Sequence, residues 1–123
     1  TTFVPEPWLD CILALKRQVE AAAGTPFNSV LLNYYRTGQD AMGWHSDDEP
    51  ELGPQPVIAS LSLGGVRRFL LRRKSGGTSS AIELAHGSLL LMQGDTQKNF
   101  QHSLPRSAKA VAARINLTFR NIL

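Results

Sequence analysis

The last strand-forming segment of the chain, residues 114–120, restricts the fold more than any other. It reads Arg114-Ile115-Asn116-Leu117-Thr118-Phe119-Arg120 and alternates polar and apolar side chains without a break. Successive side chains of a β-strand point to opposite faces, so the four polar residues share one face and the three apolar residues share the other. The segment therefore predicts a strand with one face packed on a core.

Several upstream segments also favour short strands. The predicted strands are 30–35, 57–63, 67–74, 81–84, 88–92 and 101–104, and glycine-containing turns separate most of them. Residues Ser75 to Ser80 predict a Gly/Ser-rich loop. One helix followed by seven or eight short strands predicts a mostly β fold, as a largely antiparallel sandwich, jelly roll or small barrel.

The N-terminal region predicts one helix, from about Pro5 to Ala23. Its apolar residues recur at steps of three and four and form one face: Trp8, Leu9, Ile12, Leu15 and Val19. Gly24 and Pro26 end the pattern. We expect this helix to buttress a sheet. Cys11, the only cysteine, lies in the helical pattern and predicts a small core residue.

Length and composition bound the class of protein. The 123 residues predict a single domain, with a helix region at 1–26 and a β core at 27–123. No apolar run reaches the roughly 20 residues of a membrane span, so no membrane partner is expected. A lone cysteine favours the reducing cytoplasm or nucleus. The net charge of +3 permits a polyanionic partner, and we predict a monomer.

The triplet His45-Ser46-Asp47 offers an imidazole and a carboxylate two residues apart. On a strand both would point to one face, and that mixed pair suits Fe(II), Mn(II) or Zn(II). Most such triplets are surface polar residues, so a metal site needs a third ligand. His102 is the candidate, although taken alone it favours a hydrogen-bonded histidine near a strand end. Two histidines and one carboxylate form the facial triad of non-haem iron oxygenases. His86 precedes a turn and predicts a structural histidine.

The polar face of residues 114–120 has two interpretations. In the simpler one it faces water. In the other, Arg114 and Arg120 bind the carboxylates of a small dicarboxylate, because guanidinium groups bind carboxylates bidentately. Asn33 and Tyr35 share one face of the 30–35 strand and would add an amide and a phenol.

Four motifs in this order resemble the AlkB family of Fe(II)- and 2-oxoglutarate-dependent dioxygenases, which repair alkylated nucleic acid. They are Asn33-Tyr34-Tyr35, His45-Ser46-Asp47-Asp48-Glu49, His102-Ser103-Leu104-Pro105 and residues 114–120. The resemblance runs from about Phe27 to Leu123. Residues 58–64 and 85–90 also fit the branch that acts on double-stranded DNA.

The resemblance implies a double-stranded β-helix and a role for each matching residue. It implies iron ligands at His45, Asp47 and His102, and 2-oxoglutarate contacts at Asn33, Tyr35, Arg114, Asn116 and Arg120. Arg114 and Arg120 would serve opposite ends of the co-substrate. Glu49 would contact the exocyclic nitrogen of the damaged base, where a carboxylate favours a cationic base.

The implied activity is oxidative demethylation of N1-methyladenine and N3-methylcytosine in DNA or RNA, with release of succinate, CO₂ and formaldehyde. The base would be flipped into the site. The basic residues Arg67-Arg68 and Arg72-Arg73-Lys74 favour phosphate contacts, or else a strand edge protected by charge.

One departure concerns base selection. Family members carry an upstream lid with an aromatic wall for the flipped base, and we expect this chain to lack it. Trp44 and Phe3 do not lie at the lid position, and Trp44 is expected to pack behind His45. Two alternatives stay open. One is a related dioxygenase acting on a protein or small molecule, and the other is a non-catalytic nucleic-acid-binding jelly roll.

Overall fold

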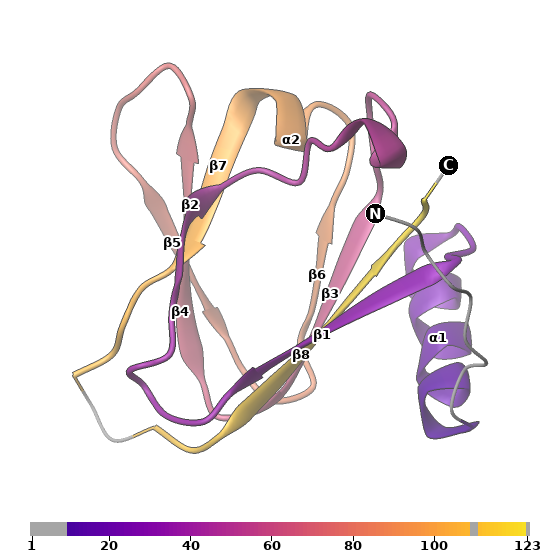
Figure 1. The fold of residues 1–123 in the computed structure, drawn as a ribbon, viewed down its shortest axis with the longest axis horizontal. Coiled ribbons are helices and arrows are strands. Elements are labelled where there is room, and N and C mark those ends of the chain that lie inside the picture. The colour runs from indigo at the N-terminus through magenta and orange to yellow at the C-terminus, as the bar shows by residue number, and fades with distance from the viewer. Residues whose placement is uncertain (1–9, 109–110, 123) are drawn as a thin grey trace.

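The computed structural model describes residues 10–108 and 111–122 (Figure 1). The elements are α1 (Asp10–Ala23), β1 (Ser29–Tyr35), β2 (Met42–His45), η1 (Pro50–Leu52), β3 (Ile58–Gly64), β4 (Arg67–Arg73), β5 (Ser80–Leu84), β6 (Leu89–Met92), α2 (Thr96–Asn99), β7 (Phe100–Leu104) and β8 (Arg114–Arg120). Among the described residues, no helix has the length and apolar character needed to span a membrane.

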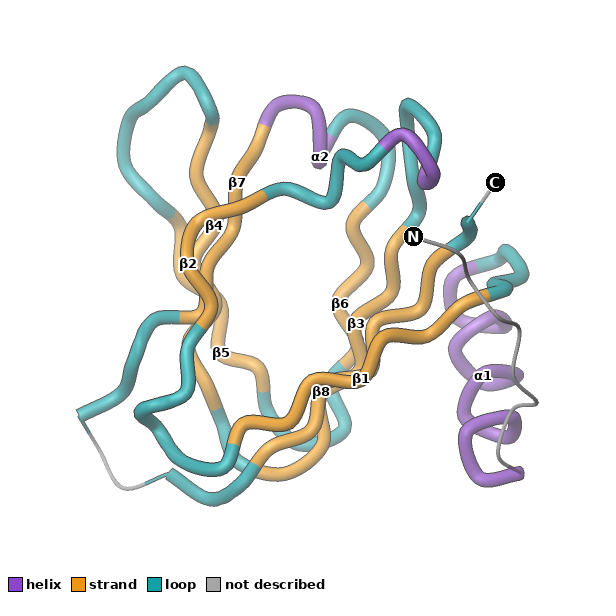
Figure 2. The backbone as a smooth tube through the Cα atoms, viewed as in Figure 1, coloured by secondary structure: helices purple, strands orange, loops and turns teal. Residues whose placement is uncertain are grey.

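Eight strands form two four-stranded sheets that face each other (Figure 2). The first sheet has the order β1-β8-β3-β6 and the second has the order β2-β7-β4-β5. All the pairings are antiparallel. The predicted mostly β, jelly-roll fold with an N-terminal helix is confirmed.

Two hydrophobic clusters hold the layers together. One lies between the sheets and contains Tyr35, Leu52, Ile58, Phe69, Leu84, Met92 and Leu104. The other joins α1 to the first sheet and contains Val19, Phe27, Ala59, Leu61, Leu117 and Phe119. Figure 1 shows α1 on the side of the first sheet that faces away from the second sheet. The helix therefore buttresses a sheet, as predicted.

Strand β8 is covered on both faces. Leu117 and Phe119, from its apolar face, are 1% and 0% exposed against the helix-side cluster. Arg114 and Asn116, from its polar face, are 2% and 8% exposed. The simpler interpretation, in which the polar face lies in water, is wrong.

The turn between β3 and β4 presses on the chain that enters β8. Gly64 has φ +100°, and a Cβ built there would lie 2.3 Å from the carbonyl oxygen of Ala113. A Cβ on Gly65 would lie equally close to the oxygen of Ala112. The Gly65 N–H donates to Ala113 O at 3.0 Å. The approach is therefore too close for a residue with a side chain.

Three elements were not predicted from the sequence: β2, η1 and α2. Strand β2 has only four residues, one of which is Gly43, and its pairing with β7 shifts register between Met42 and His45. Such a bulge breaks the alternation that sequence patterns detect. The core position expected for Cys11 is wrong, because its side chain is exposed on α1. The start predicted for the helix, Pro5 to Leu9, lies outside the described residues.

Candidate metal centre and co-substrate pocket

His45 and His102 face each other across the β2–β7 pair. They are register partners, and their ring centroids lie 4.2 Å apart. Met42 pairs with Leu104, and His45 pairs with His102. The register shifts between these two pairs, which indicates a bulge in β2. Two residues 57 positions apart in the sequence are thereby held by one backbone ladder.

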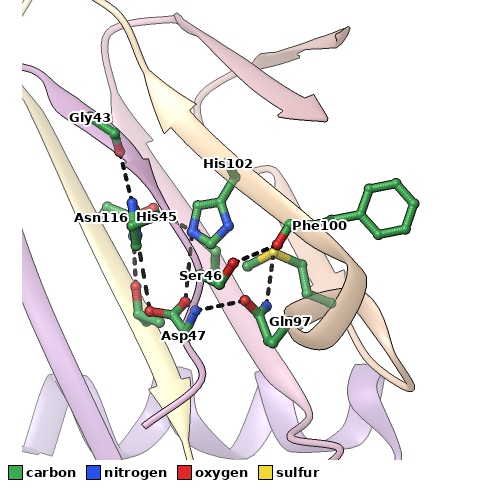
Figure 3. A network of polar contacts seen from close by, with 11 residues as sticks. Gly43, His45, Ser46, Asp47, Gln97, Phe100, His102 and Asn116 are labelled. Carbon is green, nitrogen blue, oxygen red and sulfur yellow. Dashed lines mark hydrogen bonds and ion pairs between the residues drawn. The ribbon is translucent and has the colours of Figure 1, made fainter. Parts of the chain in front are cut away.

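Asp47 follows the end of β2 and completes the cluster from a loop. Its carboxylate oxygens lie 4.0 Å from Nε2 of His45 and 3.7 Å from Nε2 of His102. One ligand atom from each of the three residues lies within 4.8 Å of the others. Figure 3 shows the carboxylate facing both rings. The predicted set is brought together, although the strand geometry expected for Asp47 is not what positions it.

Both rings turn Nε2 toward the Asp47 carboxylate. Nδ1 of His45 lies 2.9 Å from the carbonyl oxygen of Gly43, so a neutral ring donates there and keeps the Nε2 lone pair free. His102 is 5% exposed and stacks on Phe69 at 5.3 Å. Burial, and then the nearby His45, lower the pKa of His102 to about 4. At neutral pH His102 therefore presents an unprotonated nitrogen.

Burial dominates the electrostatics of the Asp47 carboxyl. It raises the pKa of Asp47 despite the opposite effects of His45 and Arg120, and neighbouring Asp48 raises it further. A divalent metal bound between the two rings would favour the ionised carboxylate. Two histidine nitrogens and one carboxylate are donors that suit a first-row metal such as iron.

A cavity of about 560 Å³ opens beside this cluster. Its lining includes nine residues singled out from the sequence: Asn33, Tyr35, His45, Asp47, Glu49, His102, Arg114, Asn116 and Arg120. The first sheet supplies the co-substrate candidates. The second sheet, with the loop that follows β2, supplies the metal-ligand candidates. The two sets meet inside the sandwich.

A buried hydrogen-bond network orders the polar face of β8. Nη2 of Arg114 donates to Ser62 Oγ at 2.9 Å and to Asn116 Oδ1 at 3.1 Å. Ser60 Oγ donates to Asn116 Oδ1 at 2.7 Å, and Asn116 Nδ2 donates to Thr118 Oγ1 at 2.9 Å. These bonds hold the Arg114 guanidinium in one orientation.

The same face carries donors that the described part of the chain does not satisfy. Nε of Arg114 and Nε of Arg120 are both buried without a hydrogen-bond partner there. Burial lowers the pKa of Arg114. Buried cationic N–H groups of this kind require an anion, and two of them suit the two carboxylates of a small dicarboxylate.

Tyr35 stands between two guanidinium groups. Its ring centroid lies 5.3 Å from Cζ of Arg114 and 5.6 Å from Cζ of Arg67. Burial raises the pKa of Tyr35 against the opposing effect of both arginines. The phenol therefore stays protonated at neutral pH and can donate a hydrogen bond to a bound anion.

The basic segment of β4 divides into two parts. Arg67 is 2% exposed and donates to the carbonyl oxygens of Thr37, Asp40 and Pro105, so its predicted availability to phosphate is wrong. The β-strand alternation that buries Phe69 also turns Arg67 inward. Arg68, the next residue, is exposed.

The three substrate-contact candidates at the end of β4 lie outside the cavity lining and have partners in the chain. Arg72 places Cζ 3.9 Å from the ring centroid of Trp44, and Arg73 places Cζ 5.2 Å from that of Phe100. Lys74 Nζ lies 3.6 Å from a carboxylate oxygen of Asp48. The Trp44 ring lies beneath the Arg72 guanidinium, and Trp44 also lines the cavity.

Sequence patterns assigned no role to four residues that support the site. Three of them join the network around Asn116: Ser60, Ser62 and Thr118. Pairing the predicted strands 57–63 and 114–120 would have predicted the contacts of Ser60 and Ser62. Gln97, which accepts a hydrogen bond from the Asp47 backbone, lies in a helix too short to leave a pattern. His86 is structural as predicted, since its Nδ1 accepts from the Gly64 N–H at 2.9 Å.

Comparisons with known proteins agree with this chemistry. A family model described as the 2OG-Fe(II) oxygenase superfamily matches residues 2–120. The alpha-ketoglutarate-dependent dioxygenase alkB homolog 3 of Bos taurus is 45% identical over 131 residues, which cover 98% of this chain and 46% of that protein. DNA oxidative demethylase ALKBH2 of Homo sapiens is 44% identical over 130 residues, which cover 99% of this chain and 50% of that protein.

The chain thus spans about half the length of the curated relatives it matches. Among solved structures, that of OsALKBH1 has a TM-score of 0.62 at 23% identity and covers 91% of this chain and 60% of its own. That likeness concerns the fold. The family model and the curated relatives carry the identification: the chain belongs to the 2OG-Fe(II) oxygenase superfamily and, within it, to the AlkB family.

Proposed function

We propose that residues 1–123 form one dioxygenase domain that uses Fe(II), O₂ and 2-oxoglutarate to remove N-alkyl groups from nucleic-acid bases. One observation carries the proposal. A single cavity is lined by a His-Asp-His cluster and by two arginines, Arg114 and Arg120, whose buried Nε atoms have no hydrogen-bond partner among the described residues. A three-ligand metal keeps positions open for a co-substrate, and the arginines supply the charge that a dicarboxylate needs.

Each ligand has an assigned task in this proposal. His45 and His102 would hold iron through ring nitrogens, and Asp47 would add a negative charge that lowers the net charge of the site. The iron, with O₂ and 2-oxoglutarate, would supply the oxidising chemistry that hydroxylates an N-methyl carbon. The co-substrate leaves as succinate and CO₂. The hydroxymethyl group then leaves as formaldehyde, and the unmodified base retains the electron pair of the broken C–N bond.

The co-substrate has a preferred direction. Arg120 lies close enough to Asp47 to lower its pKa, so this arginine serves the end of 2-oxoglutarate near the metal. Arg114 sits beside Tyr35 and within the serine–asparagine network, and it serves the far carboxylate. Asn33 is paired with Asn116 in the β1–β8 ladder and adds an amide between the two ends.

Glu49 supports an alkylated base as the substrate. Glu49 lines the cavity, and its carbonyl oxygen accepts from the Leu52 N–H of η1, which fixes its backbone. N1-methyladenine and N3-methylcytosine carry positive charge and an exocyclic amino group, both of which a carboxylate favours. One relative is named a DNA oxidative demethylase, and on that basis we assign alkylated DNA as the substrate, with RNA that carries the same lesions as a second substrate.

Phosphate contacts complete the proposed nucleic-acid interface. Lys74 and Asp48 form an exposed ion pair, with side chains 36% and 63% exposed, and such pairs exchange readily for another anion. Arg72 and Arg73 lie on the same strand end. A duplex substrate must present its base by flipping, since the cavity lies between two sheets. A DNA-repair role would place the protein in the cytoplasm or nucleus.

The test is anaerobic loading with Fe(II) and 2-oxoglutarate, followed by air, with single- and double-stranded oligonucleotides that carry N1-methyladenine. We expect stoichiometric formaldehyde and succinate. Glu49→Ala should lose formaldehyde release more than succinate formation, because the base loses its contact while the metal and co-substrate do not. Equal losses in both products would contradict the role of Glu49.

The alternatives give different outcomes in the same assay. Succinate without formaldehyde, from every oligonucleotide, would favour a dioxygenase that acts on a protein or small molecule. Failure to bind Fe(II) or Mn(II) at one equivalent, with no effect of His45→Ala, would favour the non-catalytic jelly roll.

A further inference from the structure

The three metal-ligand candidates differ in what holds them. His45 and His102 are fixed by the β2–β7 ladder, in which they are register partners. Asp47 lies beyond the last residue of β2, so no sheet hydrogen bond fixes its backbone. A carboxylate ligand on a loop must be held by other contacts, because a misplaced ligand weakens a metal site.

Two hydrogen bonds tie this loop to one short segment. The Asp47 N–H donates to Oε1 of Gln97 at 2.8 Å, and Ser46 Oγ donates to the Phe100 carbonyl at 2.5 Å. Both acceptors lie in residues 97–100, which lead directly to His102 (Figure 3). The segment that carries one ligand therefore also fixes the backbone of another.

Gln97 is placed for this task. Its side chain is 2% exposed, although glutamine is seldom buried so completely. Nε2 lies 3.5 Å from Sδ of Met92, a weak acceptor, which leaves Oε1 toward the Asp47 N–H. A donor facing that N–H would be repelled, so the chemistry fixes the orientation of the amide.

The short helix α2 anchors Gln97 from both ends. The Asn99 N–H donates to Asp95 O at 2.9 Å, and Lys74 N–H of β4 donates to Asn99 O at 2.8 Å. Asp95 Oδ1 accepts from Gln55 Nε2 at 2.9 Å. Gln97 thus rests on a fixed turn, and movement of that turn would move the Asp47 backbone.

We propose that Gln97 is the positioning residue for the carboxylate ligand Asp47, and that the hydrogen bond from Ser46 to Phe100 supports the same loop. This rests on the proposed function of the site. Gln97 does not touch the metal. It holds the loop so that the carboxylate meets the two imidazoles at the spacing one metal requires, and its loss therefore lowers metal affinity.

The test compares Gln97→Met with Gln101→Met. Methionine fills a similar volume and replaces the amide with a weak acceptor. Gln101 is the matched control, since it lies next to His102 but bonds outward to Arg72. Co(II) is titrated into each metal-free protein without oxygen, and its visible absorption spectrum reports the ligand geometry. Thermal unfolding of the metal-free proteins reports folding.

For Gln97→Met we expect a Co(II) Kd raised roughly ten- to hundredfold, the usual cost of removing a group that orients a ligand. The Co(II) spectrum should change, while Gln101→Met should match the wild type. An unchanged Kd in folded Gln97→Met, or an equal loss in Gln101→Met, would overturn the proposal. Wild-type protein that fails to bind Co(II) would instead refute the function proposed above.

Should Gln97→Met not fold, Ser46→Ala removes the other tie without disturbing a buried position. We expect a smaller rise in the Co(II) Kd, about three- to tenfold, because one of two bonds remains. A Kd equal to that of the wild type would then refute the proposal. Saturating 2-oxoglutarate in a parallel titration should leave the ratio between variant and wild type unchanged.

Discussion

The two sheets contribute to the pocket in different ways. In the first sheet, the co-substrate candidates sit at ladder positions: Asn33 pairs with Asn116, and Tyr35 pairs with Arg114. In the second sheet, one metal ligand follows a bulge and another lies on a loop tied to Gln97. Regular pairing places the co-substrate candidates and His102, whereas a bulge and a loop place His45 and Asp47.

The difference has an energetic side. Strands β3 and β8 of the first sheet are packed on both faces, since α1 covers one face and the sandwich interior covers the other. Their polar side chains are therefore fixed by the same packing that stabilises the domain. Asp47, the candidate ligand outside the sheets, depends instead on hydrogen bonds between distant segments. Substitutions in the first sheet should affect stability, and substitutions around the metal should affect binding with little effect on stability.

The largest expected effect is on the metal side. His45→Ala should abolish metal binding at one equivalent and leave no turnover above background, since two ligands cannot hold the metal. The unfolding free energy of the metal-free protein should change little, because the side chain is 33% exposed. Metal titration and denaturant unfolding measure both. If His45→Ala failed to fold, the contrast between the two sheets would be wrong, because residues around the metal would then also determine the stability of the domain.

The next effect belongs to the helix side of the first sheet. Phe119 is 0% exposed, and its ring centroid lies 6.2 Å from that of Phe27. Phe119→Ala should lower the unfolding free energy by about 3–5 kcal/mol through lost burial and a cavity. Metal affinity of the protein that stays folded should match the wild type. A loss below about 1 kcal/mol would show that α1 contributes little to the core.

Arg114→Lys tests the pocket face of the same strand. Lysine keeps the charge but loses the fixed fork of donors, so the KM for 2-oxoglutarate should rise roughly ten- to hundredfold. The Co(II) Kd should stay within about twofold, since the proposed function assigns Arg114 to the end of the pocket away from the metal. Steady-state succinate formation and the metal titration give the two numbers. Equal changes in KM and metal Kd would show that the two regions are not separable.

The smallest effect is expected at the exposed end of β4. Lys74→Ala breaks an exposed ion pair with Asp48, so stability should change by at most about 1 kcal/mol. Binding to duplex should weaken modestly, and the slope of log Kd against log salt should fall by about one. Arg17→Ala, at an exposed position on α1, is the control. A slope unchanged in Lys74→Ala would remove this residue from the nucleic-acid interface.

The same contrast explains which parts the sequence could predict. Alternation in β8 predicted its two faces, and the pairing partners of Arg114 and Asn116 follow from strands that were also predicted. Strand β2 was not predicted, because a bulge and Gly43 remove the alternation of polar and apolar side chains. The inward side of β4 was missed at Arg67, where three carbonyl oxygens from distant loops satisfy a buried cation. Gln97 escaped because its partner lies 50 residues away.

The contact between Gly64 and Ala113 has a consequence for how the strand is assembled. Ala113 immediately precedes Arg114, and Gly64 is the register partner of Arg114. A slip of β8 by one residue would point the guanidinium groups at α1 and send Ile115 and Leu117 into the cavity. The close approach of the two backbones at the glycines therefore helps to fix the register of β8. A position without a side chain decides which chemistry β8 presents to the pocket.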